Sequence, residues 1–166
     1  MSDVDALRAI PIFAGLAEAQ LGVILSTVRP QMVPSGAIIL REGEQGDSLF
    51  ILARGSVEVT KQLGLALTVP VEGVKEKTLV RLDAPQFFGE MGLLQDTERS
   101  ATVTARGECA LLEIAKADFE HLAEADPTLG YLVIRNIAVV LASRLRRTDR
   151  DIVKLTMALS LALGNR

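Results

Sequence analysis

The chain has 166 residues, 49% of them hydrophobic, which is enough to bury the core of one domain. Its net charge of −3 argues against a surface that binds nucleic acid. A single cysteine and a single histidine exclude an intrachain disulfide and a metal site of paired thiolates, and they supply no set of nucleophile, base and orienting residue. The N-terminus is acidic, and no apolar run approaches the roughly 20 residues of a membrane helix.

These limits predict one cytoplasmic domain, residues 1–166, which is not an enzyme and needs no metal or cofactor. We expect it to bind neither nucleic acid nor a membrane.

Residues 1–29 are predicted to form N-terminal helices. Pro11 and Gly15 divide this region into a short helix, a turn and a second helix. Arg29 precedes Pro30 and therefore ends the second helix, because the residue before a proline is pushed out of the α region. Apolar residues recur through the region at helical spacing: Leu7, Ile10, Leu16, Leu21, Ile24 and Leu25.

Residues 31–114 are predicted to form a β-roll. Short β-prone runs alternate with turn clusters rich in glycine and proline, a pattern typical of a sandwich or barrel, here a jelly roll. The predicted strands cover residues 37–40, 49–52, 57–60, 78–82, 101–104 and 110–114. Apolar residues alternate with other residues in the segment 62–77, which is predicted to form a long hairpin. We favour two strands with one covered face over an edge that binds a partner.

Residues 116–163 are predicted to form two C-terminal helices. The first covers residues 116–124. Asp126 is then an N-cap, and Pro127 occupies the first position of a helix that continues for about 55 Å. A helix of this length is typical of a projecting dimerisation helix.

An apolar seam runs along the long helix. Leu145, Ile152 and Leu159 step by seven residues, which predicts a homodimer through this helix. Thr148 lies on the seam, and its hydroxyl has three candidate partners: the carbonyl four residues earlier, a ligand, or the same residue of a second copy. The predicted fold class is therefore α+β, a jelly-roll β-barrel flanked by N-terminal helices and a long C-terminal dimerisation or lid helix.

Residues 88–102 combine groups that suit a sugar phosphate. A short helix that begins at Gly89 presents free backbone N–H groups, which attract anions. Arg99 adds a permanent charge with a two-pronged donor fork, and Ser100 adds a hydroxyl. Glu90 suits a sugar hydroxyl rather than a phosphate. The alternative is an exposed ion pair between Glu90 and Arg99, worth under about 1 kcal/mol.

The same segment resembles the phosphate-binding cassette of the cyclic-nucleotide-binding domain family. The family pattern is Phe-Gly-Glu, an apolar turn, and Arg-Ser/Thr/Ala-Ala before a strand, and residues 88–102 match it without a gap. Ile12-Phe13 with Gly15-Leu16 resembles the N-terminal helices of the family, and residues 42–57 resemble its early strands. The resemblance covers nearly the whole chain.

The resemblance implies a role for each matching residue. The N–H of Gly89 and the carboxylate of Glu90 hold the ribose 2′-hydroxyl, while Arg99, Ser100 and the N–H of Ala101 hold the cyclic phosphate. Residues 144–148 also resemble the Arg-Leu-x-x-Thr of the catabolite activator protein, whose threonine contacts the base. The next residue is Asp149. In the catabolite activator protein that position is a serine, which the partner subunit contributes. The same stretch contains a basic cluster, which we interpret mainly as a solvated helix face. It consists of Arg144, Arg146, Arg147 and Arg150. The expected ligand-binding residues are Gly89, Glu90, Met91, Arg99, Ser100, Ala101 and Thr148.

The resemblance thus implies a regulatory sensor that binds a cyclic nucleotide, repositions its C-terminal helix and acts on a downstream protein. Ser100, in place of threonine, favours cAMP over cGMP. Two alternatives stay open. One is a dimerisation or interaction module of the same fold without a ligand. The other is a truncated transcription regulator of the catabolite activator family, whose helix-turn-helix follows the long helix.

Overall fold

The computed structural model describes residues 3–62 and 76–164 of the chain. Three short helices open it: α1 (Asp3–Arg8), the 3₁₀ helix η1 (Pro11–Phe13) and α2 (Glu18–Thr27). The predicted breaks are confirmed, since Pro11 begins η1 and Gly15 adopts a φ of 85° before α2. The predicted end of the second helix is two residues too late. Val28 is already extended, and the first strand begins at Arg29.

In the described part of the chain, eight strands form two antiparallel sheets of four, a jelly-roll barrel as predicted. One sheet has the order β1-β8-β3-β6 and the other β2-β7-β4-β5. The strands are β1 (Arg29–Val33), β2 (Ile38–Leu40), β3 (Ser48–Arg54), β4 (Ser56–Gln62), β5 (Glu76–Asp83), β6 (Gln86–Phe88), β7 (Thr102–Ala105) and β8 (Cys109–Ala115).

Two of these strands are absent from the sequence prediction. Strand β1 is an exposed edge strand that contains Pro30, and it lacks the alternation of a typical strand and has Val33 as its one β-branched residue. Strand β6 has only three residues. The predicted hairpin is confirmed at its base, where β4 and β5 pair as far as Gln62 and Glu76, while residues 63–75 lie outside the described residues.

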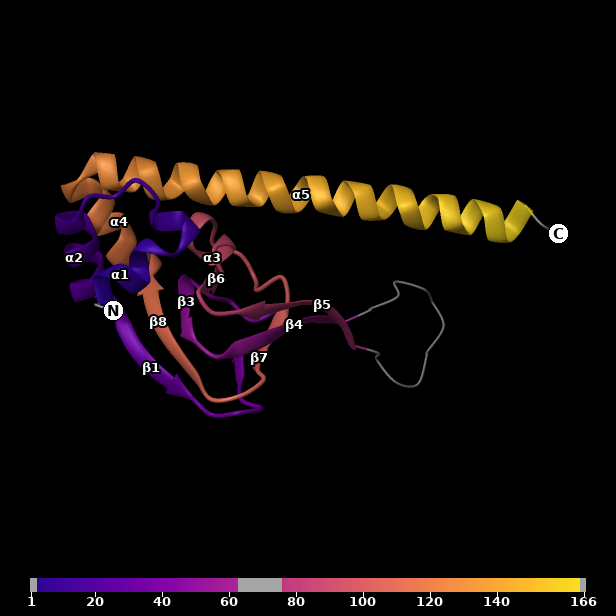
Figure 1. Ribbon diagram of the computed structural model, residues 1–166, viewed down its shortest axis with the longest axis horizontal. Helices are drawn as coiled ribbons and strands as arrows, with labels where there is room; N and C mark the ends of the chain where they lie inside the picture. Colours follow the sequence, from indigo (N-terminus) through magenta and orange to yellow (C-terminus); the bar gives the residue numbers. More distant parts are fainter. Residues whose placement is uncertain (1–2, 63–75, 165–166) are drawn as a thin grey trace.

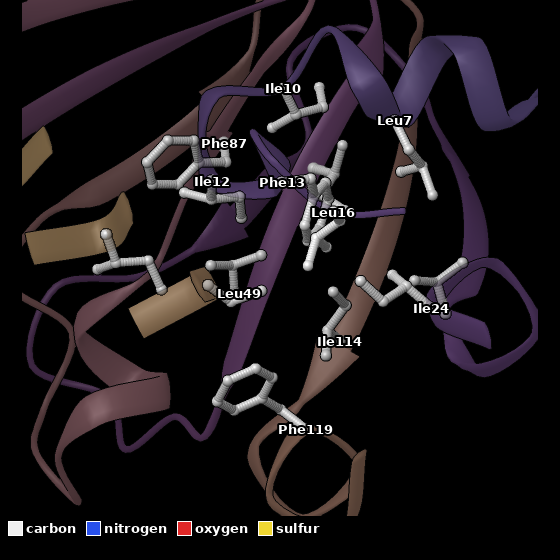
Figure 2. Packing of buried hydrophobic residues seen from close by; sticks show 14 of the residues in the cluster. Leu7, Ile10, Ile12, Phe13, Leu16, Ile24, Leu49, Phe87, Ile114 and Phe119 are labelled. Carbon is white, nitrogen blue, oxygen red and sulfur yellow. The ribbon is translucent and has the colours of Figure 1, made fainter. Parts of the chain in front are cut away.

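The hydrophobic core has two parts. The larger cluster lies between the N-terminal helices, the outer face of the β1-β8-β3-β6 sheet and the C-terminal helices, as Figure 2 shows for Phe13, Leu49 and Ile114. The smaller cluster fills the space between the two sheets. Within it, the rings of Phe50 and Phe88 stack with centroids 5.6 Å apart. Because β3 and β6 contribute to both clusters, the barrel and the helical layer share one framework.

Asp126 joins the two C-terminal helices, α4 (Lys116–Ala125) and α5 (Pro127–Gly164). Its Oδ1 accepts hydrogen bonds from the N–H groups of Thr128 and Leu129 at 3.0 and 3.1 Å, so the predicted N-cap is confirmed. Its Oδ2 accepts from Nε2 of Gln20 in α2 at 2.7 Å. The Gln20 bond, followed by the backbone bonds, holds the pKa of Asp126 below its ordinary value.

The 38-residue helix α5 is packed along its first half and projects along its second (Figure 1). Leu129, Val133 and Ile137 are buried, and the side-chain amide of Asn136 donates to the carbonyls of Ile12 and Ala14 at 3.1 and 2.8 Å. From Leu145 to Leu163 every residue is exposed.

Helix α5 departs from one expectation of the sequence. By length and composition alone, Pro127–Leu163 is apolar and long enough to cross a membrane. A helix that packs on a protein core meets the same test, and α5 packs on α4 and η1.

Replacement of Asp126 should lower the stability of the domain in a pH-dependent way. The folded-state pKa of Asp126 is depressed, so its contribution is present at neutral pH and is lost as the pH falls through that depressed pKa. We expect Asp126→Ala to lower the melting temperature at pH 7, and the difference from the parent to shrink towards about pH 3. Asp126→Asn keeps the cap and should lose less. Thermal unfolding followed by circular dichroism measures both, with Glu124→Ala as the control. A constant difference at every pH would contradict the assignment.

Candidate functional site

A cleft of about 760 Å³ lies between the barrel, the turn from β6 into α3 (Met91–Leu94), and the underside of α5. Residues from β4, β5 and β7 form its wall, and residues from Val140 to Leu155 of α5 form its roof. All seven residues predicted to bind a ligand line this one cleft: Gly89, Glu90, Met91, Arg99, Ser100, Ala101 and Thr148. The fold therefore brings together positions that are up to 59 residues apart in the chain.

Arg99 is held in a fixed position at the base of the cleft. Its side chain is only 9% exposed, and its Nη1 donates to the carbonyl of Ser48 at 2.7 Å. Nη2 donates to the Oγ of the same serine at 3.0 Å. The Arg99 backbone is also fixed, because its N–H donates to the carbonyl of Glu44 and its carbonyl accepts from the N–H of Gly43. Strand β3 and the loop before it therefore position the guanidinium.

The charge of Arg99 is buried without a counter-ion among the residues that the structure describes. Its hydrogen bonds go to neutral oxygens. Burial lowers the pKa of Arg99 from its ordinary value, and the more distant charges of Asp47 and Glu113 oppose that shift. A buried cation of this kind is costly unless an anion is supplied, so the cleft is built for an anionic group.

Two glycines make room for the guanidinium. A Cβ added at Gly92 would lie 2.6 Å from Nη1 of Arg99 and 2.6 Å from the carbonyl oxygen of Gly46. A Cβ added at Gly46 would overlap the Nε of Arg99. Any side chain at either position would push the arginine out of its place.

Glu90 is the second buried charge of the cleft, at 5% exposure. Its Oε1 accepts from Nη1 of Arg144 at 2.6 Å, and the guanidinium of Arg144 lies over the ring of Phe87, 5.3 Å from the centroid. The alternative of an exposed pair between Glu90 and Arg99 is therefore wrong. So is the interpretation of Arg144 as part of a solvated helix face, because this arginine reaches from α5 to the cassette.

The remaining predicted residues lie at the rim and the roof. Gly89 has a φ of 77°, which turns the chain between β6 and α3, and the short helix begins at Met91 rather than at Gly89. Met91 is 42% exposed and Ser100 is exposed, so both are open to solvent. The hydroxyl of Thr148 donates to the carbonyl of Arg144 at 3.2 Å, the backbone partner considered from the sequence, and the side chain also lines the cleft.

The sequence did not predict three residues that shape the candidate site. Arg144 could have been found, because it precedes Thr148 by four residues and therefore shares its helix face. Ser48 and Phe87 gave no such signal, since a serine at the start of a strand and a phenylalanine in a barrel are ordinary core residues. Their roles depend on the pairing of β3 with β6, a contact between distant parts of the chain.

Comparison with known proteins identifies the family. The model of the cyclic nucleotide-binding domain matches residues 30–126, more than half of the chain. The chain belongs to this family. Its cassette therefore lies in a cyclic nucleotide-binding regulatory domain, and the cleft is the place where the residues of that cassette converge.

Relatives of this domain are joined to different outputs. The chain is 39% identical over 124 residues to a cyclic nucleotide-gated potassium channel of Rhizobium etli, which covers 75% of this chain and 31% of the channel. It is 32% identical over 146 residues to the cyclic AMP receptor protein of Thermus thermophilus, with 88% of this chain and 62% of that protein covered. The chain thus spans about a third to three fifths of these relatives.

Solved structures agree with the fold. The Thermus thermophilus catabolite activator protein superposes with a TM-score of 0.74 at 33% identity, covering 88% of this chain and 63% of that one. A cyclic nucleotide-binding domain from Methylobacillus flagellatus superposes with a TM-score of 0.75 and covers 91% of this chain and 81% of that one. At 24% identity, the latter supports the fold alone.

Two glycine-to-alanine substitutions should act in opposite directions. Gly92→Ala inserts a methyl group between Arg99 and Gly46, and we expect a loss of about 1–3 kcal/mol in the free energy of unfolding. Gly22→Ala, at an exposed and open position inside α2, should gain up to about 1 kcal/mol from helix propensity. Urea denaturation of both variants gives the comparison. Equal effects would contradict the close approach of Gly92 to the guanidinium.

Proposed function

We propose that this domain binds cAMP in the cleft and responds by moving helix α5. The observation that carries the proposal is the guanidinium of Arg99, buried and without a counter-ion among residues 3–62 and 76–164. A cyclic phosphate supplies one negative charge and the oxygens that such a fork of donors accommodates. The matching family model and the cassette sequence support the same ligand class.

In this proposal the ligand lies along the cleft from the cassette to α5. The cyclic phosphate binds Arg99, the exposed Ser100 hydroxyl and the N–H of Ala101. The ribose 2′-hydroxyl lies at Gly89 and Glu90, and Met91 closes the rim. The base lies between the apolar wall of the barrel and Thr148 of α5. That wall is formed by Leu40, Val59, Leu79, Val80, Leu82 and Val103.

The choice of cAMP over cGMP rests on the cassette and the relatives. Ser100 follows Arg99, where a threonine often accompanies cGMP in the family. The Thermus thermophilus relative is a cyclic AMP receptor protein, although a cGMP-dependent protein kinase of Drosophila melanogaster is also similar at 33% identity over 115 residues. We therefore propose cAMP as the preferred ligand and cGMP as the competitor to test.

The pair between Glu90 and Arg144 gives the proposed route from ligand to helix. Glu90 is the proposed acceptor for the ribose hydroxyl, yet one of its oxygens already accepts from Arg144 at 2.6 Å. A ribose at this carboxylate must therefore share or displace the arginine. Because Arg144 belongs to α5, either outcome changes the free-energy difference between positions of this helix. A ligand with such an effect shifts the populations of these positions.

Dimerisation through α5 is the proposed output. In the register of Leu145, Ile152 and Leu159, these residues are a positions of a heptad, while Thr148 and Leu155 are d positions. Leu145, Ile152 and Leu159 are between 55% and 62% exposed in the single chain. Thr148, Ile152 and Leu155 also line the cleft, so the proposed ligand and the proposed second copy meet the same residues.

We further propose that the domain acts in the cytoplasm without catalysing a reaction and passes its signal to a downstream protein. The names of the relatives describe channels, a receptor protein and a protein kinase regulatory subunit, and also a glutaminase of Bradyrhizobium diazoefficiens that is 35% identical over 135 residues. This chain covers only 20% of that glutaminase. The shared portion is thus compatible with a sensor that serves different partners.

Replacement of Arg99 should abolish most nucleotide affinity. We expect Arg99→Ala to weaken cAMP binding by about 2–5 kcal/mol, because the buried phosphate loses its charged partner. Isothermal titration calorimetry with cAMP and cGMP measures the effect. Arg106→Ala, an exposed arginine on the barrel, is the control. Unfolding curves of both variants test whether they remain folded. Unchanged affinity of Arg99→Ala would refute the assignment of the phosphate site. No heat from either nucleotide with the parent would favour the ligand-free interaction module.

The proposed dimer can be tested at the seam. We expect Ile152→Asp to yield monomers, because it places a charge at an apolar a position. Met157→Asp, five residues further on at an f position, should stay dimeric. Sedimentation equilibrium with and without cAMP gives both mass and ligand dependence. A parent chain that is monomeric in both conditions would overturn the dimer and leave the nucleotide site intact.

A further inference from the structure

The projecting half of α5 has a third face, which belongs neither to the cleft nor to the seam. We call it the outer face. Arg146, Arg150 and Lys154 follow one another at four-residue spacing, and a parallel row of apolar side chains lies beside them. All of these side chains are exposed, and none lines the cleft. The outer face consists of Arg146, Arg150, Val153, Lys154, Met157 and Leu161.

The proposed dimer does not cover the outer face. In the register that makes Leu145 and Ile152 a positions, the six residues occupy b, c and f positions, which point away from the partner helix. Coiled coils carry polar residues there. Val153, Met157 and Leu161 are instead apolar and 52%, 62% and 73% exposed, so their hydrophobic area needs a different partner.

The charges of the outer face point to the nature of that partner. Arg146, Arg150 and Lys154 form no ion pair within the part of the chain that the structure covers. Like charges at four-residue spacing destabilise an exposed helix, and Asp149 and Asp151, each three residues from one of these cations, form no ion pair with them among the described residues. Carboxylates of a partner would relieve this cost. The imbalance is regional: seven of the 18 Lys and Arg residues, but only two of the 21 Asp and Glu residues, follow residue 126.

We propose that the outer face docks an acidic amphipathic segment of a partner protein, one per protomer. Carboxylates of this segment lie opposite Arg146, Arg150 and Lys154, and its apolar side chains cover Val153, Met157 and Leu161. The outer face extends for about 22 Å along α5, which suits a helix of four turns. This inference deepens the proposed function, on which it rests, because it gives the chemistry of the downstream protein.

Other occupants fit the outer face less well. In a symmetric dimer the two outer faces point in opposite directions, so a flat membrane could contact only one of them. A second copy would bring the same three cations to the contact if it packed parallel at this face. Duplex DNA suits the basic row but not the apolar row, because interfaces with nucleic acid are polar.

The test uses the full chain and a fluorescently labelled helical peptide with glutamate at i, i+4 and i+8 and leucine in the adjacent row. We expect Arg146→Gln, Arg150→Gln and Lys154→Gln together to weaken binding about tenfold in fluorescence anisotropy, the sum of three exposed ion pairs. The control combines Arg8→Gln, Arg41→Gln and Arg135→Gln, which remove the same charge elsewhere. Added salt should weaken binding of the parent, and Met157→Ser with Leu161→Ser should weaken it independently of salt.

Three results would overturn the proposal: equal peptide affinity of the neutral variant and the parent, binding to phosphatidylserine vesicles in place of the peptide, or assemblies larger than a dimer that the neutral variant abolishes. A calorimetric titration with cAMP on the same variants separates this proposal from the proposed function. Because the outer face does not line the cleft, nucleotide affinity should not change. A parent chain that binds the peptide but does not bind cAMP would refute the nucleotide site alone.

Discussion

The buried guanidinium of Arg99 constrains the rest of the site. A charge taken out of water needs oxygen acceptors and space, and the start of β3 supplies the acceptors through the carbonyl and hydroxyl of Ser48. Gly46 and Gly92 supply the space, since a Cβ at either would enter the volume of the arginine. The jelly roll is the framework that makes this possible, because it brings three segments around one side chain. Among the described residues the positive charge itself has no counter-ion, and the proposed cyclic phosphate supplies that anion.

Helix α5 connects this deficit to the outside of the molecule. Its first half is fixed by Asp126, which links it to Gln20, and by Asn136, which holds the η1 turn. Within residues 3–62 and 76–164 its second half has no such support, so there the pair between Arg144 and Glu90 is the last polar link before the helix projects. A long helix that is anchored at one end and held near its middle by one ion pair is sensitive to any change in that pair. The proposed ribose site lies at this carboxylate.

The sequence was informative where chemistry depends on local order. The cassette of residues 88–102, the cap at Asp126 and the heptad spacing all lie within one short segment each, and the structure contains the corresponding turn, cap and helix. It was uninformative where a residue acquires its role from a distant contact. Ser48 acts through Arg99, 51 residues away, and Arg144 acts through Glu90, 54 residues away. Strand β1 shows the same limit, because an exposed edge strand with a proline is defined by its pairing with β8 and not by its own pattern.

The projecting half of α5 presents three faces, and their arrangement around the helix axis has a physical consequence. Thr148 and Leu155 face the cleft and also occupy the seam, while Arg150 and Met157 lie on the side opposite the seam. Because the backbone hydrogen bonds of a helix make it a stiff rod, a rotation that frees Arg144 turns the seam and the outer face together. In the proposed function, a ligand at Glu90 therefore need not contact the outer face to change what that face meets. In the proposed function the nucleotide acts on the angle of one helix, and that single angle would set both the geometry of the proposed dimer and the position of the face proposed for the partner.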